Sequence, residues 1–252
     1  DIDFYADNVK NWISLGKSYF ENKQYKEAIR TFKKAIELKP DDFLNWHWLG
    51  CSYYGNEEYD KAIEYLLKAI ELNPDDFLNF HWLGCSYFEI GDYKNAIKSF
   101  LKSIELNSDY YPNYNWLGCS YYEIGEYKQA IKSFKKAFEL NPNNKSILNL
   151  LESTYLADEQ YKKVIKLCLE AIEKEPNSYH YWRLLGKAYY FNNQPKKAIA
   201  TYLKAIEFNS KDPIIWDSIG LIYEENGQHK EALDFFAKAI KLSPKNSGYW
   251  FN

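Results

Sequence analysis

Residues 43–76 read FLNWHWLGCSYYGNEEYDKAIEYLLKAIELNPDD, and residues 77–110 read FLNFHWLGCSYFEIGDYKNAIKSFLKSIELNSDY. The two stretches have the same length, 34 residues, and align without a gap. Their shared triplet Leu-Gly-Cys, at 49–51 and 83–85, returns at 117–119, and related glycines stand at Gly16, Gly186 and Gly220. A fixed period of this length indicates a chain built from stacked structural repeats.

Extending the period in both directions divides the chain into seven repeats without insertions. The repeats span 9–42, 43–76, 77–110, 111–144, 145–178, 179–212 and 213–246. Residues 1–8 form an N-terminal lead-in, and residues 247–252 are the start of a truncated eighth repeat or a cap, with Trp250 at the repeat position of Trp46 and Trp216. The unfinished C-terminal end and the absence of methionine predict that the chain is a piece of a longer product.

Each repeat contains two segments with helical spacing. In the first repeat Trp12, Leu15 and Tyr19 follow the i, i+3, i+7 pattern, which a second segment repeats with Ala28, Phe32 and Ala35. A polar turn, 21–23, separates them, and a breaker such as Pro40 ends the repeat. The Asp and Asn residues that follow the breaker are expected to cap the next helix.

The pattern resembles the signature of the tetratricopeptide repeat (TPR) family. The matching residues are Trp46, Leu49, Gly50, Tyr53, Ala62, Leu66, Ala69 and Pro74 in the second repeat, and Trp216, Ile219, Gly220, Tyr223, Ala232, Phe236, Ala239 and Pro244 in the seventh. The resemblance covers 9–246 and implies an all-α fold, a right-handed α-solenoid superhelix of antiparallel helix pairs. The fifth repeat departs furthest from the signature, with Leu148, Glu152, Val164 and Cys168. A bulky charged residue at the close-contact position predicts a looser stack or a bend near 145–178.

Composition narrows the classes of function. The net charge of −3 gives no reason to expect a nucleic-acid partner, and no apolar stretch reaches the roughly 20 residues of a membrane-spanning helix. Three of the four cysteines, Cys51, Cys85 and Cys119, are 34 residues apart, which places them about 10 Å apart on neighbouring helices, too far for disulfides. Free thiols favour a reducing compartment, so we expect a cytoplasmic protein.

The resemblance also implies which residues face a partner. In TPR structures the first helix of each repeat lines a concave groove, and the groove-facing residues fall at repeat positions 2, 5, 9 and 12, with 6 or 13 in some repeats. The peptide-binding residues predicted on this basis are His47, Trp48, Cys51, Tyr54, His81, Trp82, Cys85, Phe88, Asn115, Trp116, Cys119, Tyr122, Asn149, Arg183, Lys187 and Tyr190. A groove of aromatic rings and small thiols suits an extended or helical peptide with apolar or proline-rich side chains, and Glu89 and Glu123 add attraction for Lys or Arg.

Two alternatives stay open for this surface. The likeness of repeats two to four indicates either a selected groove or recent duplication. Repeats two and three match at 10 of their first 11 positions but at only 10 of the remaining 23, which favours selection. The contrast fades between repeats three and four, which match at 7 of 11 and 14 of 23 positions, so duplication stays open. Trp48, Trp82 and Trp116 are the candidate binding hot spots, and packing against the neighbouring repeat is the alternative for each.

The sixth repeat has a different chemistry. It carries six basic and two acidic residues, against two basic and seven acidic in the second repeat. His180, Arg183 and Lys187 stand at groove positions, with Asn149 and Ser153 one repeat earlier. The alternatives are an acidic segment of a ligand at Arg183 and Lys187 or a solvated charged face. The carboxylate clamp of chaperone-binding TPR domains is matched only in part, so chaperone C-terminal tails are not expected as ligands.

Catalytic and metal chemistry have weak support. His47 with Cys51, and His81 with Cys85, are i, i+4 pairs that could supply zinc ligands or a thiol nucleophile, but no orienting third group accompanies them. Phosphate-binding loops and hydrolase motifs are absent from the sequence. We therefore predict no enzyme activity, no cofactor and no metal.

The sequence favours a protein–protein interaction scaffold that holds a peptide segment of a partner in its groove. The alternative is a regulatory or substrate-recruiting arm of a larger enzyme whose catalytic part lies outside this chain. End-to-end self-association through the uncapped C-terminal repeat is a third hypothesis. The expected partner is a protein or peptide, with no nucleic acid and no membrane insertion.

Overall fold

The computed structural model describes residues 2–142 and 144–244, with side chains from residue 9 onward except Lys145. All regular structure in these ranges is α-helix. The first helices of the successive pairs are α1 (Ile2–Glu21), α3 (Phe43–Gly55), α5 (Phe77–Glu89), α7 (Tyr111–Glu123), α9 (Lys145–Ala157), α11 (Tyr179–Phe191) and α13 (Pro213–Glu225). The second helices are α2 (Tyr25–Leu38), α4 (Tyr59–Leu72), α6 (Tyr93–Leu106), α8 (Tyr127–Leu140), α10 (Tyr161–Lys174), α12 (Pro195–Phe208) and α14 (His229–Leu242).

The helix bounds follow the 34-residue period. Every second helix begins and ends 34 residues after the one before it, and the same holds for the first helices from α3 onward. Helix α1 is longer because it begins at Ile2 and so includes residues 2–8 of the lead-in. The eighth repeat or cap predicted at 247–252 lies outside the described residues.

The turn inside each helix pair needs a residue with positive φ at the fifteenth position of the repeat. Glycine supplies it at Gly91, Gly125 and Gly227, with φ between 74° and 78°. The other four repeats adopt the same left-handed conformation without glycine, at Lys23, Glu57, Glu159 and Asn193, with φ between 55° and 61°. The Cβ atom makes this conformation costly for non-glycine residues, so these four turns carry local strain.

Aspartate caps several first helices, as the sequence predicts. The carboxylates of Asp42, Asp76 and Asp212 accept hydrogen bonds from the backbone N–H two residues later, at 3.2, 3.0 and 2.9 Å. Each bond satisfies an amide that the first turn of the helix leaves unpaired.

Close contact within a pair depends on a glycine in the first helix. A Cβ added at Gly50 would lie 2.6 Å from the Leu66 side chain, and one at Gly84 would lie 2.7 Å from the Phe100 ring. The fifth repeat exchanges both members of this contact, because Glu152 replaces the glycine and Cys168 replaces the large apolar residue. Both are buried, at 2% and 0% exposed. The smaller Cys168 makes room for the Glu152 side chain, a compensation that the sequence analysis did not anticipate.

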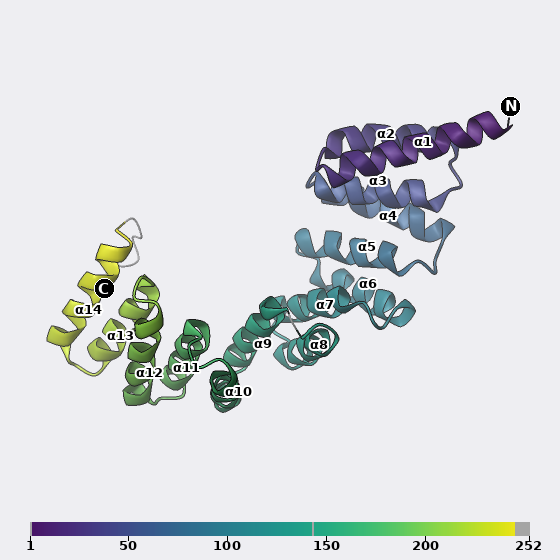
Figure 1. Cartoon of the computed structure of the whole chain (residues 1–252). Coiled ribbons are helices and arrows are strands. Elements are labelled where there is room, and N and C mark those ends of the chain that lie inside the picture. The colour runs from purple at the N-terminus through teal and green to yellow at the C-terminus, as the bar shows by residue number, and fades with distance from the viewer. Residues whose placement is uncertain (1, 143, 245–252) are drawn as a thin grey trace. The chain divides into compact units, whose positions relative to one another are not determined.

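Two compact units make up the chain, with the division between Leu151 and Glu152. Both residues belong to α9, one of the helices labelled in Figure 1. In the first unit, Phe32, Leu49 and Leu66 are centres of a core that continues through Phe100. In the second unit, Tyr202, Ile215, Ile219 and Ile222 form the core. The bend predicted near 145–178 stays a prediction.

None of the described helices is both long and apolar enough to cross a membrane. The four cysteines, Cys51, Cys85, Cys119 and Cys168, are all free in the structure.

Candidate peptide-binding surface

The first helices of the first unit form a continuous face. Helix α1 contacts α3, α3 contacts α5, and α5 contacts α7, whereas contacts of this extent do not join α2, α4, α6 and α8 in the described part of the chain. Closer approach of the first helices is what a stack shows when those helices line its inner, concave side. The groove positions predicted in repeats two to four belong to the helices of this face.

Aromatic rings connect one repeat to the next along the face. The ring at the twelfth position of one repeat packs edge-on against the tryptophan at the sixth position of the next. The three pairs are Phe20 with Trp48, Tyr54 with Trp82, and Phe88 with Trp116, with ring centroids 5.3, 5.1 and 5.0 Å apart. Contacts of this geometry add roughly 0.5–1.5 kcal/mol each beyond area burial.

The three tryptophans therefore pack against neighbouring side chains and also form part of the surface. Trp48 and Trp116 also stack on Phe32 and Phe100, at 6.2 and 6.5 Å. All three tryptophans are only partly buried, so each leaves part of its indole at the surface. Each tryptophan thus packs against the neighbouring repeat, which was the alternative to a binding role. A ligand would contact the ring edges that remain accessible.

Four of the predicted contact residues lie below this surface. His47 and His81 are 5% exposed, and Cys51 and Cys85 are 1% exposed. The prediction that these four residues line an open groove is wrong for this structure, because the fifth and ninth positions of repeats two and three lie under the first helix of the following repeat.

The buried histidines bind asparagines of the next repeat. His47 Nδ1 lies 2.6 Å from Asn79 Oδ1, and His81 Nδ1 lies 2.8 Å from Asn113 Oδ1. Because the amide oxygen accepts, each Nδ1 carries the proton, and each Nε2 is left to accept from a cysteine thiol at 3.6 or 3.7 Å. We call the two His–Asn pairs the His–Asn ladder.

The ladder does not extend beyond repeats two to four, because the neighbouring repeats lack the histidine or the asparagine that a further pair would need. Asn45 stands at the same position as Asn79, but the repeat before it has Ile13 where the histidine would be, and the Asn45 Oδ1 atom is buried without a hydrogen-bond partner. At the other end Asn115 replaces the histidine, the next repeat offers Ile147, and Asn115 Oδ1 is also unsatisfied. The ladder thus joins repeats two, three and four only.

Burial keeps the ladder neutral. It lowers the pKa of His47, lowers that of His81 to about 4, and raises the pKa values of the Cys51 and Cys85 thiols. Neutral thiols that donate to a neutral imidazole are poor nucleophiles. Among the described residues, no group of three or more His, Cys, Asp and Glu side chains is arranged to hold a metal.

The exposed part of the face in the first unit is aromatic and acidic. The Tyr54 hydroxyl donates to Glu89 Oε1 at 3.3 Å, so a ring of one repeat and a carboxylate of the next are joined. Glu89 and Glu123 are exposed, as is Tyr122. Cys119 is half-buried, and burial raises its pKa to about 11. Asn149 is exposed on α9.

In the second unit, acidic side chains accompany the predicted basic residues. His180 Nε2 lies 3.5 Å from Glu152 Oε2, and the Tyr190 hydroxyl donates to Glu225 at 2.5 Å. Arg183 and Lys187 lie over the rings of Tyr179 and Phe191, at 5.9 and 6.0 Å. The printed acidic contacts thus belong to His180 and Tyr190, and the anion site at Arg183 and Lys187 stays a prediction.

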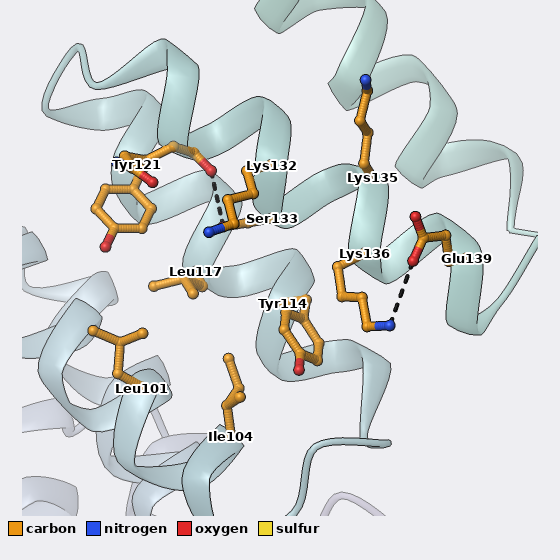
Figure 2. A pocket seen from close by; sticks show the side chains of 11 residues that line it. Leu101, Ile104, Tyr114, Leu117, Tyr121, Lys132, Ser133, Lys135, Lys136 and Glu139 are labelled. Carbon is orange, nitrogen blue, oxygen red and sulfur yellow. Dashed lines mark hydrogen bonds and ion pairs between the residues drawn. The ribbon is translucent and has the colours of Figure 1, made fainter.

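A cavity on the side of the second helices was missed by the sequence analysis. It lies between α6, α7 and α8, has a volume of about 630 Å³, and is bordered by Tyr114, Tyr121 and Ser133 (Figure 2). The signal was present in the sequence as a serine at a position where repeats two and seven carry Tyr65 and Phe235. Ser133 lies on a second helix, whereas the groove positions that the family resemblance implies lie on first helices.

Comparisons with protein families match several parts of the chain. The model described as anaphase-promoting complex, cyclosome, subunit 3 matches residues 21–103. Models described as tetratricopeptide repeat match 113–144 and 213–246, and one described as TPR repeat matches 186–227. No curated protein sequence gives a significant match.

Solved structures of TPR proteins share the fold at low sequence identity. The C-terminal part of a TPR repeat-containing protein from Cytophaga hutchinsonii is 20% identical, with a TM-score of 0.78 over 94% of this chain and 98% of that one. A TPR protein from Parabacteroides merdae is 14% identical, with a TM-score of 0.66 over 97% and 96% of the two chains. The Cut9–Hcn1 hetero-tetramer of the APC/C gives 17% identity and a TM-score of 0.56 over 93% of this chain and 46% of that one. The periodic signature, the helix pairs and these matches agree: the chain belongs to the tetratricopeptide repeat family, whose tandem helix pairs form protein-interaction scaffolds.

Proposed function

We propose that the first-helix face of the first unit binds an extended segment of a partner protein that carries basic and apolar side chains. The observation behind this proposal is the row of half-exposed rings at Tyr54, Trp82, Phe88, Trp116 and Tyr122. Contacts between repeats hold Tyr54 against Trp82 and Phe88 against Trp116, and Tyr122 packs on Tyr127 of its own repeat. The rings are therefore ordered before a ligand arrives, and a preorganised surface loses little entropy on binding.

Exposed carboxylates give the surface its charge preference. Glu89 and Glu123 follow the rings Phe88 and Tyr122 directly in the sequence, and both are exposed. A lysine or arginine of the partner would meet a ring face and a carboxylate together, which combines cation–π and charge attraction. Apolar side chains of the same segment would pack on the exposed indole edges of Trp82 and Trp116.

Selection from a random peptide library displayed on phage tests the proposal. We expect the purified protein to enrich peptides with Lys or Arg next to aromatic, Leu or Pro residues. Their affinity should fall at least tenfold, on the order of 1.4 kcal/mol or more, for Glu89→Lys with Glu123→Lys. The matched control is Glu64→Lys with Glu105→Lys, which changes the net charge equally at exposed positions on second helices.

Two results would count against the proposal. One is selected peptides without basic residues. The other is an equal loss of affinity in both double variants, which would indicate long-range charge attraction rather than contact with the first-helix face. Far-UV circular dichroism of each variant establishes that the helices are retained.

A further inference from the structure

The cavity on the second-helix side of the fourth repeat has an apolar interior. Leu101 and Ile104 of α6 and Leu117 of α7 line it, together with the rings of Tyr114 and Tyr121 on α7 and the Ser133 side chain on α8 (Figure 2). Leu117 is 4% exposed and Ser133 is 6% exposed, so these two form the floor. The two tyrosine rings are only partly buried and form the walls.

In two other repeats the protein fills the equivalent place with a ring of its own. In the second repeat Tyr65 stacks on Tyr53, with centroids 5.1 Å apart and planes 9° apart, and on Trp46, at 6.0 Å and 24°. In the seventh, Phe235 stacks on Tyr223 at 5.3 Å and 19° and packs against Trp216 at 6.0 Å and 30°. Each set is a stack of three rings, with the central ring supplied by the second helix.

The fourth repeat keeps the two outer rings and lacks the central one. Tyr114 and Tyr121 correspond to Trp46 and Tyr53, and Ser133 corresponds to Tyr65. The outer residues are seven positions apart on one helix, a rise of about 10 Å, which leaves room for one ring about 5 Å from each. The Ser133 hydroxyl donates to the backbone oxygen of Gln129 at 2.9 Å, so it is already satisfied and does not need water in the slot.

The rim of the slot is basic. Lys132, Lys135 and Lys136 border it together with one acidic residue, Glu139, in a chain whose net charge is −3. Lys136 pairs with Glu139 at 3.4 Å, but both side chains are about half exposed or more, and such pairs are weak. Lys136 corresponds to Lys238 of the seventh repeat, which lies over Phe235 and Trp216 at 5.6 and 4.5 Å. A ring placed in the slot would therefore meet a cation from the same direction.

We propose that this slot is a second binding site, which takes one aromatic side chain from an acidic segment of a partner protein. The ring occupies the central place between Tyr114 and Tyr121, and acidic residues on either side of it meet Lys132 and Lys136. The site is formed by α6, α8 and residues of α7 that do not belong to the first-helix face, so it is independent of the function proposed above.

Peptide binding measured by titration calorimetry and by saturation-transfer NMR tests this site. The probe is acetyl-Asp-Glu-Tyr-Asp-Glu-amide, compared with versions in which Ala replaces Tyr or Lys replaces the four acidic residues. We expect saturable binding of the first peptide and at least tenfold weaker binding of the other two. Lys132→Glu with Lys136→Glu should weaken the binding of the first peptide at least tenfold.

The decisive variant is Ser133→Tyr, which fills the slot from inside as Tyr65 does in the second repeat. We expect it to keep the helical signal and the unfolding midpoint and to lose the peptide. The matched control is Ser99→Tyr, the same change one repeat earlier, where Leu101 stands in place of Lys135. It should leave the affinity unchanged.

Three outcomes would overturn the proposal. The first is equal affinity of the acidic aromatic peptide for the wild type and for Ser133→Tyr, including no measurable binding to either. The second is loss of binding in Ser99→Tyr as well, which would place the peptide elsewhere. The third is a dimer of the wild type, seen by light scattering without peptide, that Ser133→Tyr dissociates, because the slot would then belong to a second copy of the chain.

Discussion

At the scale of single residues, the turn inside four of the helix pairs has a non-glycine residue in an unfavourable left-handed backbone conformation. Glu57 adopts φ 61°, a conformation that Gly91, Gly125 and Gly227 adopt at the same repeat position. We predict that Glu57→Gly raises the free energy of unfolding by about 1 kcal/mol, because the strain of a Cβ in this region exceeds the entropy cost of glycine. Urea titration followed by circular dichroism measures the change. Gly91→Ala is the reverse control and should destabilise, and a neutral result for both would refute the strain argument.

A second residue-scale prediction concerns acid. His81 has its pKa lowered to about 4 from an unfolded value of 6.5, so the unfolded chain takes up the proton first as the pH falls. The stability linked to this group is complete above pH 6.5, falls by about 3 kcal/mol as the pH drops towards 4, and is constant below that.

The variant His81→Gln removes the titration and keeps a side chain able to hydrogen-bond. Between pH 7 and 4.5, the wild type should lose about 2 kcal/mol more unfolding free energy than this variant does, because most of the His81 contribution is lost in that interval. Carboxylates titrate in both proteins, and their effect cancels in the difference. Equal losses would mean that His81 is not held neutral by the fold.

The first-helix face shows how far single residues could be predicted. The period and the family signature locate the helices, and they identify Tyr54, Phe88 and Tyr122 as accessible. They could not show that His81 and Cys85 are buried, because the depth of a residue on a helix face depends on how closely the next repeat packs over it. The hydrogen bond between His81 and Asn113 could not be predicted from the sequence either, because these residues are 32 positions apart and meet only when the helices pack.

At the scale of helix pairs, the fifth repeat uses a different pair of residues where its two helices meet. In other repeats a glycine of the first helix contacts a large apolar side chain of the second, and here Glu152 and Cys168 occupy these two positions. The Glu152 carboxylate is 2% exposed, and its Oε2 atom lies 3.5 Å from His180 Nε2 without a hydrogen bond between them. Single substitutions towards the family pattern should therefore fail where the double substitution succeeds.

We predict that Cys168→Phe alone destabilises the protein by roughly 1–3 kcal/mol, because the larger ring meets the Glu152 side chain. Adding Glu152→Gly should recover most of the loss. A double-mutant cycle, with unfolding free energies from urea titration, measures the coupling between the two positions. Additive effects of the two changes would show that they do not share this space.

The unfilled slot of the fourth repeat also belongs to this scale. It could have been recognised by comparing second-helix positions across repeats, since Tyr65 and Phe235 stand where Ser133 does. Whether a serine leaves a cavity or the surrounding helices close over it depends on packing, which a one-dimensional pattern does not contain.

At the scale of the whole molecule, each repeat contacts mainly its neighbours, so stability is expected to be local. In such arrays a destabilising change weakens the nearby repeats first. Ile219 and Leu66 are both fully buried, one in each compact unit. We predict that Ile219→Ala speeds amide exchange in α11–α14 and leaves α1–α4 unchanged, and that Leu66→Ala does the reverse.

Hydrogen exchange followed by mass spectrometry reads out both variants in the same experiment. Faster exchange throughout the chain in either variant would indicate that the two units unfold as one cooperative block. Each substitution is of the kind that costs about 2–5 kcal/mol in a core, which is large enough for its spread to be mapped.

The His–Asn ladder has a consequence for how such a chain can lengthen. A repeat inserted beside repeat three must offer an asparagine to the histidine before it and a histidine to the asparagine after it. A copy of repeat three, with Asn79 and His81, supplies both and adds one rung. A copy of repeat four has Asn113, which can pair with the histidine before it, but it has Asn115 in place of the histidine that would pair with the next repeat. The middle of the array can therefore grow by duplicating one particular member, and duplication of the next one ends the series.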